Sequence, residues 1–516
     1  MRLSGLILCV LISGAVAAEE RDEVTLRILH STDVHSHLED GAVPGHGGWL
    51  RLAAKVAAER QRLGRDRVVL LDSGDACQGS ECALLSRGAC GAAMLKQLDY
   101  DAWAPGNHDL DFGPERFRQL IEAAGVPCLA ANLSVASDKL IKPWTLIERR
   151  GWRLAVIGMQ AGYLENWFRP QELQGVNIKG MEESLRTWLP EVKKSRPDLI
   201  LMICHQGLLS RDPRGVNEVL AATRRFPEIR LVLGGHTHLE NPGLLCASGS
   251  WYVQAGFHGD KIAAVDLHFV PGKGLAGIES ELLDIGSGPA DPAASLALKP
   301  YLDAAAAEKI RPICKLAAPL KAGKPGQDCA LSAVLGQALI RSTQADIAMQ
   351  GNFGRFDLRG EVTGADLFRV VPYENGIVSF DVLPGELPGL IAEQEKWRSS
   401  AGFQAPWGFT ATLRPGQTTE IALPPELAGR DKLRIAVSSR SAAGGGGRYP
   451  LMKRLASDPG RRAVDHPIGL RQALEELLQT GPPGEFHITV IRPKPPRQKG
   501  VTSKQSEEIP DEQAEN

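Results

Sequence analysis

Short apolar runs alternate with segments of helical periodicity from residue 25 to about residue 285, and this alternation limits the fold more than any other feature of the chain. The apolar runs expected to form strands are Leu26–Leu29, Val68–Leu71, Leu154–Ile157, Leu199–Cys204 and Leu231–Leu233. Between them, Leu50–Leu63 places apolar residues at helical spacing with charged residues on the other face. Strands that alternate with helices are typical of an α/β layer fold, which we therefore predict for residues 24–285.

The length of 516 residues exceeds what one hydrophobic core usually organises, so we expect two large domains. Two prolines and two glycines in residues 285–292 indicate a linker, and residues 293–310 favour a connecting helix, giving a junction over 286–312. A second, smaller α/β unit should then span 313–493, with a helix at Leu331–Ile340 and a strand at Ala345–Gln350. Residues 494–516 contain almost no apolar side chain, which predicts a disordered tail.

The N-terminus has the pattern of a secretory signal peptide over residues 1–18. Arg2 precedes an apolar stretch from Leu6 to Val16, and small residues follow directly before Glu19. A buried first helix is the alternative. Later apolar runs are too short to span a bilayer, and the hydrophilic C-terminus does not match a lipid-anchor signal. We expect a periplasmic or secreted protein without a membrane anchor, whose oligomeric state the sequence leaves open.

Charge and cysteine content narrow the possible partners and redox chemistry. A formal net charge of -2 gives no reason to expect a nucleic-acid polymer as partner. Eight cysteines follow the signal segment, and an even number in an exported chain permits disulfides. The sequence-local candidates are Cys82 with Cys90 and Cys314 with Cys329. Buried free thiols are the alternative, above all for Cys128 and Cys204.

Polar side chains follow the ends of several predicted strands. They lie in Asp33-Val34-His35, Gly74-Asp75, Gly106–Asp111, Cys204-His205 and Gly235-His236-Thr237-His238. Sites in open α/β sheets form outside the carboxyl ends of the strands, so these groups can converge. A lone histidine after a strand is usually structural, and a lone Gly-Asp usually marks a turn, but five such motifs in order are not expected by chance. Carboxylate, amide and imidazole ligands without thiolate predict a hydrolytic metal centre that activates water.

The motif series resembles the calcineurin-like metallophosphoesterases and is similar, within them, to the secreted 5′-nucleotidases and UDP-sugar hydrolases. The series reads DxH, GDxxxG, GNHDxD, a later strand-end His and GHTH, and the resemblance covers nearly all of the chain from Val24 to Arg492. It implies a layered metallophosphoesterase α/β sandwich, a smaller α/β substrate-binding domain and two divalent metal ions. The ligands it implies are Asp33, His35 and His238 for one ion, Asn107, His205 and His236 for the other, and Asp75 as the bridge. Zn, Mn, Fe and Co all accept such ligands.

The resemblance gives His108 a different role from its neighbour Asn107. It implies that His108 contacts the phosphoryl oxygen and that Asp111 orients the ring and favours its charged form. A helix-start cap is the other interpretation of Asp111, because residues 112–115 begin a helical segment. His258, in the loop after the last metal motif, is a further candidate for a place near the site.

Substrate recognition is expected in the second domain. The stretch Gln350–Arg355 resembles the Asn-Gly-Gly-Gly-Ile-Arg of 5′-nucleotidase C-terminal domains, which places Arg355 at a phosphate or terminal carboxylate. Tyr373 and Tyr449 stand where the family holds a nucleobase between two aromatic rings, although packing is the alternative for each. Gln350 and Asn352 are further candidate substrate-binding residues of this stretch, although both depart from the family pattern. Residues 326–329 also lack the family's arginine, so one phosphate or ribose contact is expected to be missing.

These observations predict a secreted, dinuclear metal-dependent phosphoester hydrolase. The resemblance implies a 5′-nucleotidase that releases phosphate from nucleotides by in-line attack of a metal-bound hydroxide. The same chemistry on UDP-sugars, 2′,3′-cyclic nucleotides or a sulfur-containing ester remains an alternative, because the second domain departs from the pattern. A nucleotide-binding protein without turnover is a remote alternative, since all seven expected ligands are present.

Overall fold

The computed structural model describes residues 22–135, 139–208, 218–323, 329–351, 356–373, 375–398, 400, 402–412 and 419–480. The signal segment, the tail from residue 494, Asn352 and Arg355 lie outside these ranges, so the expectations about them stay predictions. Within the described residues no helix is long and apolar enough to cross a membrane.

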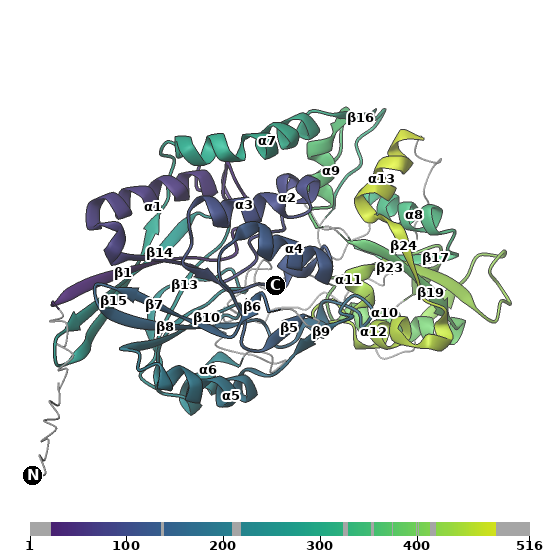
Figure 1. Cartoon of the computed structure of the whole chain (residues 1–516). Helices are drawn as coiled ribbons and strands as arrows, with labels where there is room; N and C mark the ends of the chain where they lie inside the picture. The colour runs from purple at the N-terminus through teal and green to yellow at the C-terminus, as the bar shows by residue number, and fades with distance from the viewer. Residues whose placement is uncertain are drawn as a thin grey trace, which may run out of the picture.

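The first domain is built on two packed sheets (Figure 1). In spatial order, the first sheet consists of β15 (Gly274–Asp284), β14 (Lys261–Val270), β1 (Val24–Ser31), β2 (Val68–Asp72), β3 (Ala102–Trp103), β4 (Cys128–Leu129) and β6 (Ile141–Lys142). The second consists of β12 (Glu240–Leu245), β13 (Trp251–Ala255), β11 (Ile229–Leu233), β10 (Leu199–Cys204), β8 (Trp152–Met159) and β7 (Trp144–Arg149). Apolar residues of β1, β2, β8, β10 and β11 share one buried cluster, which joins the sheets face to face.

Helices cover the two outer faces of this sandwich. The first sheet is covered by α1 (Trp49–Leu63), α2 (Glu81–Ser86), α3 (Ala89–Gln97), α4 (Pro114–Ala124) and α7 (Pro292–Lys309). The second sheet is covered by α5 (Met181–Lys194) and α6 (Val219–Arg225). Short elements complete the domain: η1 (Arg65–Arg67), η2 (His108–Leu110), η3 (Leu164–Asn166) and the pair β5 (Leu133–Val135) with β9 (Val176–Ile178). The result is a four-layer α/β/β/α arrangement.

The predicted connecting helix is α7, which runs along the edge of the first domain towards the second (Figure 1). The Asp291 side chain accepts a hydrogen bond from the Ala294 amide at 2.7 Å, and Pro292 occupies the first turn, so both ordinary start signals of a helix are present. Ala294, Leu298 and Ala305 are buried in the core of the first domain. The connecting helix is therefore packed against that domain along its length.

The second domain surrounds a five-stranded mixed sheet. In spatial order its strands are β20 (Ala405–Trp407), β17 (Ile347–Gln350), β23 (Leu433–Ser438), β19 (Gly376–Val382) and β24 (Val464–Gly469). Its helices are α8 (Ala330–Thr343), α9 (Gly364–Val370), α10 (Leu387–Glu395), α11 (Ser439–Ala442), α12 (Pro450–Ser457) and α13 (Leu470–Gln479), with η4 (Pro384–Glu386) and η5 (Pro459–Arg461). Two small pairs remain, β16 (Pro312–Lys315) with β18 (Glu361–Thr363) and β21 (Thr410–Thr412) with β22 (Glu420–Ala422).

The predicted fold class is confirmed, and most differences concern the ends of elements. Leu199–Cys204 matches β10 residue for residue, whereas Leu26–Leu29 is the centre of the eight-residue β1. The strand predicted from Ala345 begins at Ile347, because the Ala345 amide still bonds to the Ile340 carbonyl and closes helix α8. Tertiary pairing extends a strand beyond its apolar centre, which periodicity alone does not reveal.

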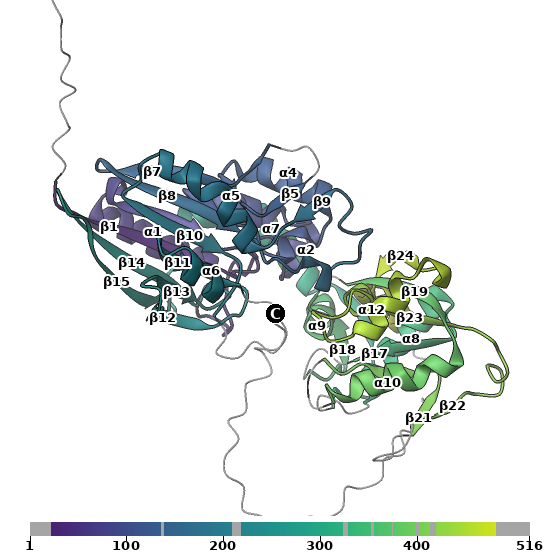
Figure 2. The same cartoon turned by 90° about the horizontal axis from the view of Figure 1, so that it is seen from below.

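The second domain lies beside one end of the sandwich, as the view from below shows (Figure 2). The Gly446 amide of the second domain donates to the Asn166 carbonyl of the first at 2.9 Å. Arg169 forms an ion pair with Asp465, which lies at the start of β24. The guanidinium carbon of Arg440 lies 4.5 Å from the centre of the Trp167 ring. Residues from both domains therefore line the space between them.

The eight cysteines of the described residues carry free thiols. Cys128 and Cys204 are fully buried, as the free-thiol alternative expects. Of the two local candidate pairs, the contacts of the described residues show proximity for Cys82 and Cys90, whose thiols interact with each other.

Candidate metal centre

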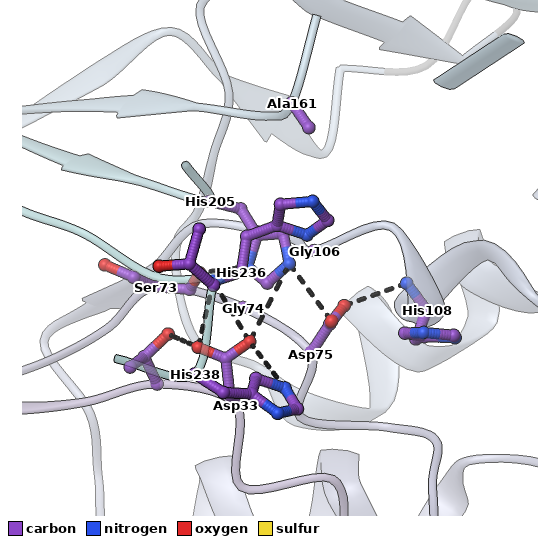
Figure 3. A network of polar contacts seen from close by, with 12 residues as sticks. Asp33, Ser73, Gly74, Asp75, Gly106, His108, Ala161, His205, His236 and His238 are labelled. Carbon is purple, nitrogen blue, oxygen red and sulfur yellow. Dashed lines mark hydrogen bonds and ion pairs between the residues drawn. The ribbon is translucent and has the colours of Figure 1, made fainter. Parts of the chain in front are cut away.

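The predicted ligands come together where parallel strands of both sheets end. In the first sheet β1, β2 and β3 run parallel and lead into the loops of Asp33, Asp75 and Asn107. In the second sheet β10 and β11 run parallel and lead into His205 and His236. Because the two sheets are packed face to face, these ends meet at one edge of the sandwich (Figure 3). The sequence prediction of convergence at strand ends is thus borne out by the fold.

Two clusters of three side chains have the spacing of metal-binding groups. One consists of Asp33, His35 and His238, and the other of Asp75, His205 and His236, with the donor atoms of each cluster within 4.8 Å of one another. Asp75 reaches both clusters: its Oδ2 lies 3.0 Å from His205 Nε2 and 3.8 Å from His35 Nε2. This is the position that a bridging carboxylate requires.

The donor atoms fit two cations. Asp75 Oδ2, Asn107 Oδ1 and His205 Nε2 are all buried and make no hydrogen bond of good geometry, although Asp75 Oδ2 and His205 Nε2 lie 3.0 Å apart. Buried polar atoms are normally paired, so these acceptors and this imidazole nitrogen, pointing at one space, indicate a bound positive charge. His35 Nδ1 lies 2.8 Å from the Gln78 carbonyl and His205 Nδ1 lies 2.7 Å from the Ser73 carbonyl. A carbonyl can only accept, so each Nδ1 carries a proton and each Nε2 faces the other groups of the clusters, His238 for His35 and Asp75 for His205.

The ligand loops are held in an unfavourable backbone conformation. Asp33, His35, Asp75, His236 and His238 all have φ between 51° and 73°, the left-handed region that residues with a Cβ avoid. Such strain costs on the order of 1–3 kcal/mol per residue and is retained mainly at functional sites. Hydrogen bonds between the loops oppose it, including Asp33 N to Gly74 O at 2.9 Å and His35 N to Asp75 O at 2.8 Å. Five of the seven predicted ligands are thus among the 13 non-glycine residues with positive φ in the described part of the chain.

The electrostatics of the cluster follow from burying several carboxylates and imidazoles together. Burial lowers the pKa of His205, but Asp75 and Asp33 outweigh it and raise the pKa to about 10. Burial, aided by the charge of Asp75, raises the pKa of Asp33 to about 7 although His205 acts against it. Burial also acts to raise the pKa of Asp75, yet His205 and His108 hold it well below its usual value. Metal binding must therefore displace a strongly held proton from His205.

His108 lies beside the clusters without joining them. Its Nδ1 is 2.7 Å from Asp111 Oδ2, and its Nε2 is buried without a hydrogen-bond partner. Burial lowers the pKa of His108, but Asp111 and Asp75 outweigh this effect and raise the pKa above its ordinary value. The alternative interpretation of Asp111 as a helix cap is not what the structure shows, because Gly113 is the N-cap of α4 and no side chain caps it. Asp111 orients the His108 ring instead.

Asp109 is a positioning residue to which the sequence analysis gave no role. Its fully buried carboxylate accepts hydrogen bonds from four backbone amides, those of Asp75, Ala76, Cys77 and Gly106, at 2.7–3.0 Å. One side chain thus ties the Asp75 loop to the loop that carries Asn107 and His108. The place of Asp109 within the GNHDxD motif was a signal that it has a role. Its four hydrogen-bond partners could not be predicted, because they depend on how two separate loops turn.

We expect Asp109→Asn to destabilise the protein and loosen the metal centre. Asparagine keeps one acceptor oxygen but directs an NH₂ donor at backbone amides that are themselves donors, so bonds to a charged acceptor are lost. The expected loss is about 2–4 kcal/mol in the free energy of unfolding, measured by urea denaturation. The matched control Asp303→Asn changes an exposed residue of α7 and should alter stability by less than about 0.5 kcal/mol. Equal stability of the two variants would contradict this role.

The expected substrate residues of the second domain are placed unequally. The ring of Tyr373 lies 6.1 Å from that of His108 in a stacked orientation, directly beside the centre. Tyr449 is only 2% exposed, packs within the core of its domain and donates its hydroxyl to the Gly402 carbonyl. Gln350 is fully buried, and its Nε2 donates to the Gly351 carbonyl at 3.0 Å. The structure brings only Tyr373 of these three to the centre.

Three further groups surround the ligands. The Trp167 ring meets the His236 ring edge to face at 5.8 Å, and Arg440 lies over both Trp167 and Tyr373. His258 stacks on His37 at 3.6 Å and meets the His35 ring at 5.8 Å, so its expected place near the site is observed. Trp167 and Arg440 escaped the sequence analysis because neither stands in a metal motif; an isolated tryptophan in a loop gives no signal of the ring it will contact.

Comparison with known proteins agrees with this geometry. The model of the calcineurin-like phosphoesterases matches residues 26–240, and that of the 5′-nucleotidase C-terminal domain matches residues 313–453. A 5′-nucleotidase of Vibrio cholerae is 25% identical over 504 residues, which is 87% of this chain and 90% of the relative. A 2′,3′-cyclic-nucleotide 2′-phosphodiesterase/3′-nucleotidase of Salmonella typhimurium is 26% identical over 306 residues, 52% of this chain and 46% of the relative.

The fold agrees as well. The crystal structure of a putative 5′-nucleotidase from Staphylococcus aureus superposes with a TM-score of 0.78 at 18% identity, covering 91% of this chain and 99% of that one. The two family models match the two domains in the order that the structure shows. Residues 26–240 therefore match the calcineurin-like phosphoesterases, and residues 313–453 match the 5′-nucleotidase C-terminal domain.

Proposed function

We propose that the protein is a phosphomonoesterase that releases inorganic phosphate from nucleotides, 5′-monophosphates first. The observation that carries the proposal is the pair of buried ligand clusters sharing Asp75, with His108 Nε2 free beside them. The similarity to a 5′-nucleotidase over 87% of the chain supports nucleotides as the substrate class.

The proposed ligands are Asp33, His35 and His238 for one divalent ion and Asn107, His205 and His236 for the other, with Asp75 between them. When bound, the two ions would acidify a shared water and stabilise the attacking and leaving oxygens of an in-line displacement.

His108 would donate a hydrogen bond from Nε2 to a phosphoryl oxygen, because Nδ1 is engaged by Asp111. The raised pKa of His108 favours its imidazolium form, which offsets the negative charge that develops on the phosphoryl group. Tyr373 would close the site on the side of the second domain, since its ring lies parallel to that of His108. In this mechanism the residues that neutralise charge belong to the first domain, and residues of both domains enclose the substrate.

Export to the periplasm or the cell exterior is part of this proposal. It rests on the signal-like residues 1–18 and on the Glu19-Glu20 pair that follows the small residues. Because the ligand clusters are buried, we propose a small-molecule phosphoester as the partner.

A second candidate is hydrolysis of another ester by the same residues. The burial of Tyr449 favours it, because the predicted pair of rings around a base is not formed. UDP-sugars, 2′,3′-cyclic nucleotides and sulfur-containing esters are the candidates, and the relative from Salmonella typhimurium is a cyclic-nucleotide phosphodiesterase by name.

A substrate panel tests the proposal. Purified protein loaded with Mn²⁺, Zn²⁺, Fe²⁺ or Co²⁺ should release phosphate from AMP, and EDTA should abolish the activity. The same preparations are assayed on UDP-glucose, 2′,3′-cyclic AMP and a thiosulfate ester. A preference for any of these over AMP would move the assignment to the second candidate. Fewer than one bound ion per chain without activity on any ester would refute hydrolysis and favour a binding protein.

A further inference from the structure

A cavity of about 570 Å³ lies between the two domains and opens onto His108. From the first domain it is lined by Asn107, Asp111 and the loop of residues 167–172. From the second it is lined by residues of β19, α11 and β24, with Tyr373 beside His108. Its position places it where the leaving group of a phosphoester must lie when the phosphoryl group contacts His108 Nε2.

Three side chains of this cavity carry hydrogen-bond donors without an acceptor. They are Trp167 Nε1, Arg169 Nη1 and Asn375 Nδ2. The residues are 8%, 2% and 6% exposed, so water is largely excluded from them. Buried donors are normally satisfied, and three orphaned donors in one cavity, from both domains, indicate that a ligand supplies the acceptors.

The charges that line the cavity are balanced. Besides His108, which pairs with Asp111, its cationic side chains are Arg87, Arg169 and Arg440, and its anionic side chains are Asp111, Glu172 and Asp465. Arg169 binds both Glu172 and Asp465 through ion pairs. A cavity of this kind does not select a strongly charged leaving group. It suits hydroxyl groups, which accept from the orphaned donors and donate to the carboxylates.

Four aromatic rings line the cavity: an arginine guanidinium lies over each of Phe112, Trp167 and Tyr373, and Phe168 packs against the core of the first domain. Tyr449 is not among the lining residues, and its ring is covered by its own domain. The guanidinium of Arg440 lies over Trp167 at 4.5 Å and over Tyr373 at 5.5 Å. A nucleobase would have to displace Arg440 to stack on either ring.

We propose that the enzyme recognises the leaving group through its sugar hydroxyls, with Trp167 and Arg169 of the phosphoesterase domain and Asn375 of the second domain as specificity-determining residues. This proposal rests on the proposed phosphomonoesterase function and narrows its substrate class. The sugar is held by donors from both domains, and the base contributes little. Sugar phosphates without a base are therefore substrates as well.

Three substrates that differ only in the leaving group test this proposal: AMP, ribose 5-phosphate and ethyl phosphate. The expected kcat/KM for ribose 5-phosphate lies within about threefold of that for AMP, and that for ethyl phosphate lies about tenfold or more below both, because a site built to bind hydroxyls penalises their absence. Trp167→Phe and Asn375→Ala should each lower kcat/KM about tenfold more on ribose 5-phosphate than on ethyl phosphate. A hundredfold preference for AMP over ribose 5-phosphate would overturn the proposal, as would equal losses on both test substrates.

Trp103→Phe is the matched control. Trp103 is fully buried in the core of the first domain, its Nε1 also lacks a partner, and it does not line the cavity. This control should leave the ratio of the two rates unchanged, whatever its effect on stability.

A binding measurement separates this proposal from the proposed function. Calorimetry on the full-length His108→Ala protein measures the affinities of ribose 5-phosphate and ethyl phosphate without turnover. Tighter binding of ribose 5-phosphate, lost in the Trp167→Phe double variant, supports sugar recognition even if no ester is hydrolysed. Equal affinities in an active enzyme would overturn sugar recognition while the phosphomonoesterase function stands.

Discussion

His108→Ala is expected to lower kcat on AMP by about 10³-fold or more while the bound metal remains. The variant removes a buried donor aimed at the phosphoryl group, and one such donor in a water-excluded site is worth about 10²–10³ in rate, with proton donation adding to this. His108 belongs to neither ligand cluster, so elemental analysis should find the same metal content as in the unchanged protein. A variant that retains the full rate would refute the mechanism, and a variant that loses its metal would show that His108 is a ligand.

Two further variants make this result specific. His268→Ala removes a partly exposed histidine near the end of β14 and should leave the rate unchanged. Asp111→Asn removes the charge and the hydrogen bond that raise the pKa of His108. The imidazolium persists only below its pKa, so a lower pKa should move the basic limb of the pH–rate profile to lower pH. A profile that stays in place would show that Asp111 does not act through His108.

The raised pKa of His108 also makes the stability of the folded protein depend on pH. Because the folded-state pKa of His108 is raised, the pair with Asp111 contributes its full stabilisation below the unfolded-state pKa of about 6.5. That stabilisation is lost as pH rises through the folded-state value. In Asp111→Asn the free energy of unfolding should therefore change less with pH over this range.

The sequence was sufficient for the fold class and for the position of the metal centre, because both depend on local patterns. Asp33, Asp75 and His205 each follow a short apolar run, and parallel strands bring such ends together whatever the rest of the chain does. The positive φ of Asp33 and Asp75 strengthens the same conclusion, because such a turn is a local property of the chain.

The sequence was insufficient where contacts join distant segments. Asp109 acts through amides of a loop more than thirty residues away, and Trp167 matters because Arg440 of the other domain lies over it. Tyr449 shows the opposite case: the family pattern predicts an exposed ring, yet the glycine run Gly444–Gly447 lets the backbone turn so that the ring packs inward beside Gly445. The contact of Trp167 with Arg440 depends on how the two domains meet, and the position of the Tyr449 ring depends on left-handed turns of the backbone.

Asp75→Asn is expected to have the second large effect, the loss of the paired metal ions together with about 10³-fold or more of the activity. The substitution keeps the side-chain shape, and its oxygen can still accept the His108 amide, which bonds Asp75 Oδ1 at 2.8 Å. It removes a negative charge that lies 3.0 Å from His205 of one cluster and 3.8 Å from His35 of the other. Two dications held close together repel strongly in a buried site unless an anion lies between them. Metal analysis should find the stoichiometry falling from two ions to one or fewer per chain.

Asp72→Asn is the matched control, because it makes the same change three residues earlier on the same strand end. Asp72 is also buried, accepting from Ser31 Oγ at 2.6 Å and from the Gly74 amide at 2.8 Å. Burial raises its pKa to about 8, so at pH 7 the side chain is mostly protonated and the substitution removes little charge. Two ions per chain should therefore remain in Asp72→Asn. If Asp75→Asn also kept both ions at pH 7, charge neutralisation by Asp75 would not be what holds the metals, and the bridging role would be wrong.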